Sequence, residues 1–76
     1  MKLEIVEPAV FAIVKADKSI EYVPCIRVRN ELSLRKIPVA GNVSNKETAM
    51  KVAASLFNRG ASFCERLVNQ SLEMSV

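Results

Sequence analysis

The sequence predicts an α+β fold in which a three-stranded antiparallel sheet is followed by one long C-terminal helix packed on one sheet face, in the order βββα. Two observations predict it. Short apolar stretches separated by turn residues fill the first half of the chain, which is typical of antiparallel strands. Apolar residues at helical spacing fill the second half. No repeat or linker divides the 76 residues, so residues 1–76 are expected to form a single domain.

The strands are predicted from β-branched and aromatic residues that lie between turn signals. They are Val10–Val14, Ile20–Arg29 and Leu32–Val39, separated by polar turns at residues 16–19 and 30–31. Pro24 lies inside the predicted middle strand, where a proline removes a hydrogen bond of the ladder. We therefore expect either a bulge at Pro24 or a strand order that makes this strand an edge.

A capping box is expected to open the helix. The Ser44 side chain can accept from the backbone N–H of Glu47, and the Glu47 carboxylate can reach back to Ser44. Two readings fit the segment Thr48–Glu73 that follows. Either Gly60 ends a first helix and a second short one is capped by Ser62 and Glu65, or the helix is continuous.

We favour the continuous helix because its apolar residues keep one spacing through the glycine. One apolar line along this helix consists of Ala49, Ala53, Leu56, Gly60, Phe63 and Leu67. A second line consists of Met50, Ala54, Phe57, Ala61, Cys64 and Val68.

The strand register is predicted by asking which pairing separates charged from apolar side chains. An odd number of loop residues aligns Val28 with Leu34 and Arg27 with Arg35, which keeps the arginines off the core face. The helix-facing side then consists of Phe11, Ile13, Ile20, Tyr22, Ile26, Val28, Leu32 and Leu34, with Lys36 at the margin. The opposite face consists of Val10, Ala12, Val14, Val23, Cys25, Ile37 and Val39, with Arg27, Arg29 and Arg35 at the hairpin tip.

This opposite face is predicted to be an interface. One helix covers only one side of a sheet, so a monomer would expose roughly several hundred Å² of apolar surface there. The N-terminal residues Leu3, Ile5 and Val6 could cover it, but a second molecule is the favoured occupant. The leading hypothesis is a small non-catalytic binding or regulatory protein of bacterial or phage type. It would form a homodimer or dock on a protein partner through the seven apolar residues.

The residue types present argue against catalysis. The chain has no histidine and two glycines, which excludes a histidine-based triad and a glycine-rich phosphate loop. Cys25 and Cys64 are expected to be unbridged small apolar residues in the reducing cytoplasm. We expect no enzyme, no metal site, no cofactor, no small-molecule substrate and no membrane span.

Nucleic-acid binding is the alternative function. The net charge of +3 permits it, and Arg27, Arg29 and Arg35 would be the contacting residues. Three strands followed by the strand exit, cap and alanine-rich helix of Gly41–Leu56 resemble the layout of AP2-type and integrase arm-type DNA-binding modules over about half of the chain. The resemblance implies a sheet face that reads the major groove. Because this face is rich in valine and isoleucine, the resemblance ranks below the protein-binding hypothesis.

Overall fold

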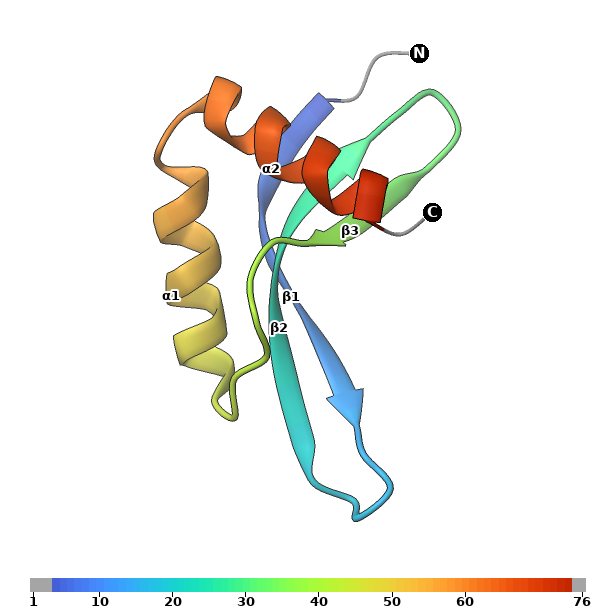
Figure 1. The fold of residues 1–76 in the computed structure, drawn as a ribbon, viewed down its shortest axis with the longest axis vertical. Helices are drawn as coiled ribbons and strands as arrows, with labels where there is room; N and C mark the ends of the chain where they lie inside the picture. Colours follow the sequence, from blue (N-terminus) through green and yellow to red (C-terminus); the bar gives the residue numbers. More distant parts are fainter. Residues whose placement is uncertain (1–3, 75–76) are drawn as a thin grey trace.

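The structure is a computed structural model, and it describes residues 4–74. Its elements are β1 (Glu4–Val14), β2 (Ile20–Arg29), β3 (Leu34–Pro38), α1 (Lys46–Phe57) and α2 (Ala61–Met74). The strands form one antiparallel sheet in the order β1-β2-β3 (Figure 1). β2 has the predicted bounds, whereas β1 begins at Glu4 rather than Val10. Ile5 and Val6 therefore belong to the sheet and do not cover it, and Leu3 lies outside the described residues.

The prediction of one long C-terminal helix is wrong, because the chain turns at Gly60. The φ of Gly60 is 111°, a conformation that side-chain-bearing residues rarely adopt. α1 ends where the N–H of Asn58 donates to the Ala54 carbonyl (2.9 Å), and α2 begins where the N–H of Cys64 donates to the Gly60 carbonyl (3.1 Å). The two helices consequently run in different directions, and α2 crosses the sheet (Figure 1).

The N-cap of α1 lies one residue beyond the predicted cap. Asn45, not Ser44, is the N-cap, and its side-chain oxygen accepts from the N–H of Thr48 at 3.2 Å. Asparagine and serine are both favoured at this position, so the sequence alone did not separate them. Glu47 still lies in the first turn, near the positive end of the helix dipole.

The predicted register is also wrong by one residue. Val28 pairs with Arg35, and Arg29 pairs with Leu34. The cause is the turn at residues 30–33, which the Asn30 side chain holds by accepting from the N–H groups of Leu32 and Ser33 at 2.8 Å each. A shift of one residue moves side chains to the other face of the sheet.

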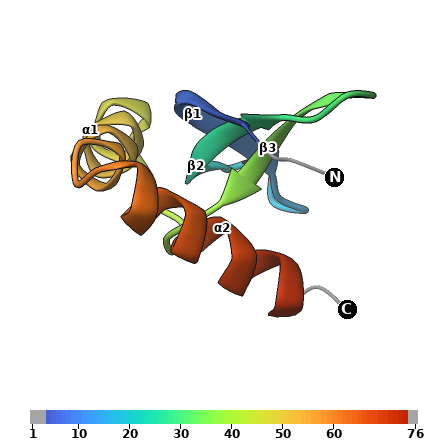
Figure 2. The ribbon, with the colours of Figure 1, turned by 90° about the horizontal axis from the view of Figure 1, so that it is seen from above.

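The faces of the sheet follow from this register. The helix face contains Ile26, Val28 and Ile37, which pack against Phe57 of α1 and against residues of α2. The residues of α2 in this core are Cys64, Val68 and Leu72. Seen from above, α1 and α2 flank one side of the sheet (Figure 2). Residues predicted for the helix side that lie instead on the opposite, outer face are Phe11, Ile13, Leu34 and Lys36.

The outer face is covered at its centre by the curl of the sheet. Ala9, Val23 and Cys25 are buried there, with 4%, 6% and 0% of their surface exposed. β1 and β3 are not neighbours in the sheet, yet they come into contact. The Nζ of Lys36 on β3 lies 3.1 Å from the carbonyl oxygen of Val10 on β1. The sheet therefore shields part of its own outer face, which the prediction of a fully open face did not consider.

Pro24 lies in the central strand without interrupting a ladder. β3 ends at Pro38, the N–H of Val39 donates to the Pro24 carbonyl (3.0 Å), and the chain returns to β2 where Val43 and Tyr22 exchange two hydrogen bonds. The backbone nitrogen of Pro24, which carries no hydrogen, faces the gap between these two contacts. Neither predicted solution is correct, because β2 is not an edge and the bulge lies in β1, between Ile5 and Glu7.

Candidate interaction surface

The seven residues of the predicted interface do not form one surface. Those that lie on or beside the helix face are Val10, Ala12, Val14, Ile37 and Val39. Val23 and Cys25 lie on the outer face. Ile37, Val23 and Cys25 are buried, and only Ala12 and Val14 are exposed.

The three arginines of the alternative hypothesis are also separated. Arg27 and Arg29 lie on the outer face, whereas Arg35 lies opposite Val28 on the helix face. Arg29 donates from Nε and Nη2 to the Glu4 carboxylate at 3.2 and 2.7 Å. The Nε of Arg27 lies 3.5 Å from a carboxylate oxygen of Glu7. Because two of the three cations are paired with acids of β1, they do not form a free basic cluster.

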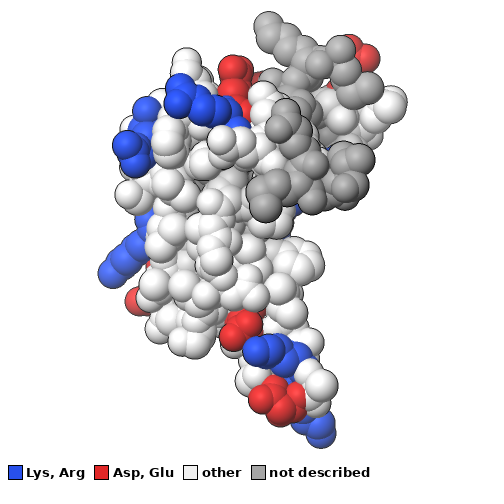
Figure 3. All heavy atoms as spheres, in the orientation of Figure 1, with Lys and Arg blue, Asp and Glu red and all other residues white. Residues whose placement is uncertain are grey.

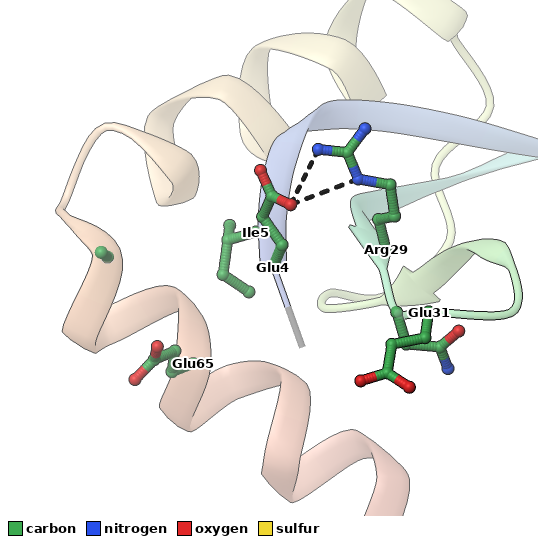
Figure 4. A pocket seen from close by; sticks show the side chains of 7 residues that line it. Glu4, Ile5, Arg29, Glu31 and Glu65 are labelled. Atoms are coloured by element: carbon green, nitrogen blue, oxygen red, sulfur yellow. Dashed lines mark hydrogen bonds and ion pairs between the residues drawn. The ribbon is translucent and has the colours of Figure 1, made fainter. Parts of the chain in front are cut away.

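A pocket of about 560 Å³ lies between the start of β1, the β2–β3 turn and the first turns of α2 (Figure 4). It is lined by Glu4, Ile5, Arg29, Asn30, Glu31, Ala61 and Glu65. Glu4 and Arg29 point toward one another, so the one cation among the described lining residues is already paired. Among residues 4–74, no group of three or more His, Cys, Asp or Glu side chains is placed to hold a metal ion. Sequence reasoning missed this pocket because its lining comes from separate segments.

The end of the β1–β2 hairpin comprises residues 11–22, and its tip projects beyond both helices (Figure 1). Its apolar side chains are exposed on both faces: Val14 (69%) and Ile20 (45%) pair on the helix face, and Phe11 (53%) lies on the outer face. Element lengths explain this exposure. An 11-residue strand spans roughly 36 Å, whereas the 12-residue α1 spans only about 18 Å. The helix is too short to cover the whole hairpin.

The turn at the tip of this hairpin end is well ordered by hydrogen bonds. The N–H of Lys15 donates to the Ser19 carbonyl at 2.9 Å. The Asp17 carboxylate accepts from the hydroxyl and the N–H of Ser19 at 2.6 and 3.0 Å, and these bonds lower the pKa of Asp17. The hairpin end is therefore a preorganised projection.

The tip carries balanced charge. Its basic residues are Lys15 and Lys18 and its acidic residues are Asp17 and Glu21, so they sum to zero. Lys15 and Glu21 form an ion pair at 3.5 Å. Figure 3 shows basic and acidic side chains side by side at this tip, below a largely uncharged surface.

The outer edge of β1 is open along the hairpin end. Tyr22 exchanges hydrogen bonds with Val43, so its N–H and carbonyl point away from β1. The residues of β2 on either side of Tyr22 therefore direct their backbone groups toward β1. By the same alternation Phe11 and Ile13 bond to β2, while Ala12 and Val14 direct their backbone groups outward. Within residues 4–74, no hydrogen bond reaches these outward groups of Ala12 and Val14.

Neither cysteine offers a reactive thiol at this surface. Cys25 and Cys64 are unbridged and 0% and 1% exposed. Burial raises the pKa of both thiols, an effect that the charge of Lys36 partly opposes at Cys25. Neither described helix has the length and hydropathy of a membrane span.

Known protein families, curated proteins and solved structures offer no match to this chain. A function therefore has to be argued from the geometry of the hairpin end alone.

Proposed function

We propose that this chain is a small non-catalytic binding protein that associates with a second copy of itself through the hairpin end. The observation that carries the proposal is the pair Val14 and Ile20, which lie opposite one another and are 69% and 45% exposed. A two-stranded hairpin is marginally stable on its own in water. Contiguous exposed apolar side chains on such a projection are typical of an interface.

Charge supports self-association. The chain carries a net charge of +3, which would oppose the approach of two copies elsewhere on the surface. The hairpin tip is neutral by residue count, and the stretch Pro8–Val14 contains no charged residue. Two hairpin ends can therefore meet without net charge repulsion between them.

The chemistry of the titratable groups supports binding rather than catalysis. The raised pKa values of Cys25 and Cys64 keep both thiols in the protonated, unreactive form near neutral pH. The Asp17 carboxylate is engaged within its own turn. Two unbridged thiols also suit a reducing compartment, and we place the protein in the cytoplasm on that ground.

Sedimentation velocity from micromolar to near-millimolar concentration tests the proposal. The wild type is expected to dimerise, and the double variant V14K/I20K is expected to dimerise at least about tenfold more weakly, since the burial of one aliphatic side chain contributes about 1.5–3 kcal/mol. The matched control is L32K. Leu32 is 86% exposed but lies in the β2–β3 turn, outside the hairpin end, so L32K should dimerise like the wild type. A wild type that stays monomeric at every concentration overturns the proposal.

A further inference from the structure

We infer that the two copies pair edge to edge, so that β1 at Ala12 and Val14 forms an antiparallel ladder with the same edge of the second copy. This inference rests on the proposed self-association and specifies its geometry. The alternative is contact between side-chain faces with no shared backbone hydrogen bonds. The two geometries differ in what happens to the outward N–H groups of Ala12 and Val14.

The first support is that one half of the β1 edge is protected and the other half is not. Glu4 and Glu7 place charges along the first half, a bulge lies between Ile5 and Glu7, and Pro8 has no N–H to offer. Charges, bulges and prolines are the devices by which natural sheets prevent edge pairing. None of them occurs from Ala9 to Val14. The second half of the β1 edge is therefore open and apolar, and we expect it to accept a partner strand.

The second support is that the open edge complements itself. Lys36 already donates a hydrogen bond to the Val10 carbonyl. The residues of the open edge whose outward backbone groups have no partner among the described residues are therefore Ala12 and Val14. An antiparallel copy with its twofold axis at Ile13 places Ala12 opposite Val14 of the second copy. In that register each outward N–H of these two residues meets an outward carbonyl. Ile13, half-buried on the outer face, is then covered by Ile13 of the second copy.

The third support is that such pairing closes as a dimer. The other outer strand, β3, has five residues and ends at Pro38, and it carries Arg35 and Lys36. A short, charged, proline-ended strand is a poor template for further pairing. Among the described residues, the β1 edge at Ala12 and Val14 is therefore a better template than β3, and a twofold axis pairs this stretch with the same stretch of the second copy.

Hydrogen exchange followed by NMR tests the geometry directly on the wild-type chain. Phe11 and Ile13 donate to β2 and should be protected at all concentrations. Ala12 and Val14 should be protected above the dimerisation concentration and should lose at least tenfold protection on dilution below it. Ala12 and Val14 amides that exchange freely in an established dimer overturn the edge geometry.

A pair of substitutions at one site gives an independent test. A12P removes the outward N–H without touching a bond to β2, and Pro8 shows that this edge of β1 accepts a proline. A12V keeps the N–H and suits a strand. The expected result is a folded monomer for A12P and a dimer for A12V, with circular dichroism as the check on folding.

The outcomes separate the two proposals. If the wild type dimerises and V14K/I20K does not, but A12P dimerises like A12V, self-association stands and edge pairing is wrong. If the wild type is monomeric throughout, both proposals are wrong, and a strand from another protein becomes the occupant to seek. A wild-type dimer with concentration-dependent protection of Ala12 and Val14, lost in A12P, supports both.

Discussion

Lys36 on β3 donates a hydrogen bond to the carbonyl oxygen of Val10 on β1, although β2 separates the two strands. The Nζ–O distance is 3.1 Å. Because the Val10 carbonyl lies on the outer edge of β1, this bond joins the two edges of the sheet. Cys25, in the strand between them, is completely buried although no helix residue belongs to its core cluster. The long lysine stem suits this role, because its methylenes can lie on apolar surface while its ammonium stays near water.

K36M is expected to lower the free energy of unfolding by about 0.5–1.5 kcal/mol, because it keeps most of the stem and removes the donor. Urea denaturation measures this change. The matched control is R35M, at the neighbouring residue on the other face, which forms no ion pair with a described residue. R35M should change stability by less than about 0.5 kcal/mol. Equal losses of unfolding free energy in the two variants would show that the Lys36–Val10 hydrogen bond does not stabilise the curled sheet.

A53L is expected to destabilise the protein by about 1–3 kcal/mol through overpacking. Ala49 and Ala53 are both 0% exposed, which shows that α1 approaches its neighbours where its side chains are smallest. The control S55L introduces the same side chain at an exposed position of the same helix and should be nearly neutral. Chemical denaturation of the three proteins makes the comparison. A53L as stable as S55L would mean that the space beside Ala53 can expand.

The presence of three strands was predictable because alternation and turn residues act locally, but their order was left open by Pro24 and their faces were not predictable. The β2–β3 register was chosen to keep the arginines off the core face. Arg35 nevertheless lies on the helix face, whereas Arg27 and Arg29 lie on the outer face. In the fold, Glu7 and Glu4 on β1 lie opposite these arginines and pair with them. Such pairing lets charge and buried residues share the outer face. Four turn residues, held by Asn30, then fix the register.

The proposed interface overlaps the interface predicted from the sequence only in part. Val14 was assigned to it, whereas Ile20 was assigned to the helix side. Ile20 does lie on the helix face, but it is 45% exposed there. The difference between strand rise and helix rise explains this exposure from the observed lengths of β1 and α1, which differ from the predicted lengths. The buried residues could not be assigned in advance, because curling of the sheet depends on a contact between strands that are not neighbours.

The same hydrophobic pattern fits one continuous helix or two helices, and the turn at Gly60 decides between them. G60A is expected to destabilise by about 1–2 kcal/mol, because alanine is strained at a φ of 111°. A methyl group added at either Gly60 or Gly41 would meet no atom within 4 Å apart from its own chain neighbours, so crowding does not contribute at either site. Gly41 has no positive φ, and G41A should be neutral or slightly stabilising. A thermal melt in which both variants behave alike would contradict the backbone argument.

Stability is expected to fall at alkaline pH because both thiols are buried. Burial raises the pKa of Cys25 and Cys64 in the folded protein, whereas a cysteine of the unfolded chain titrates at about 8.5. Below that pH both states keep the proton and the stability is fully present. As the pH rises above it the unfolded chain loses protons that the folded chain retains, so the free energy of unfolding decreases, by at most about 1.4 kcal/mol per pH unit for each thiol.

Urea denaturation at a series of pH values from about 7 to about 9.5, which bracket the pKa of a free thiol, measures the slope. The double variant C25A/C64A is expected to be less stable at a pH of about 7, because it leaves small cavities, but to lose little further stability up to a pH of about 9.5. The variant separates the contribution of the two buried thiols from that of the other groups that ionise at alkaline pH. A variant that declines as steeply as the wild type would assign the alkaline loss to those groups instead of to the buried thiols.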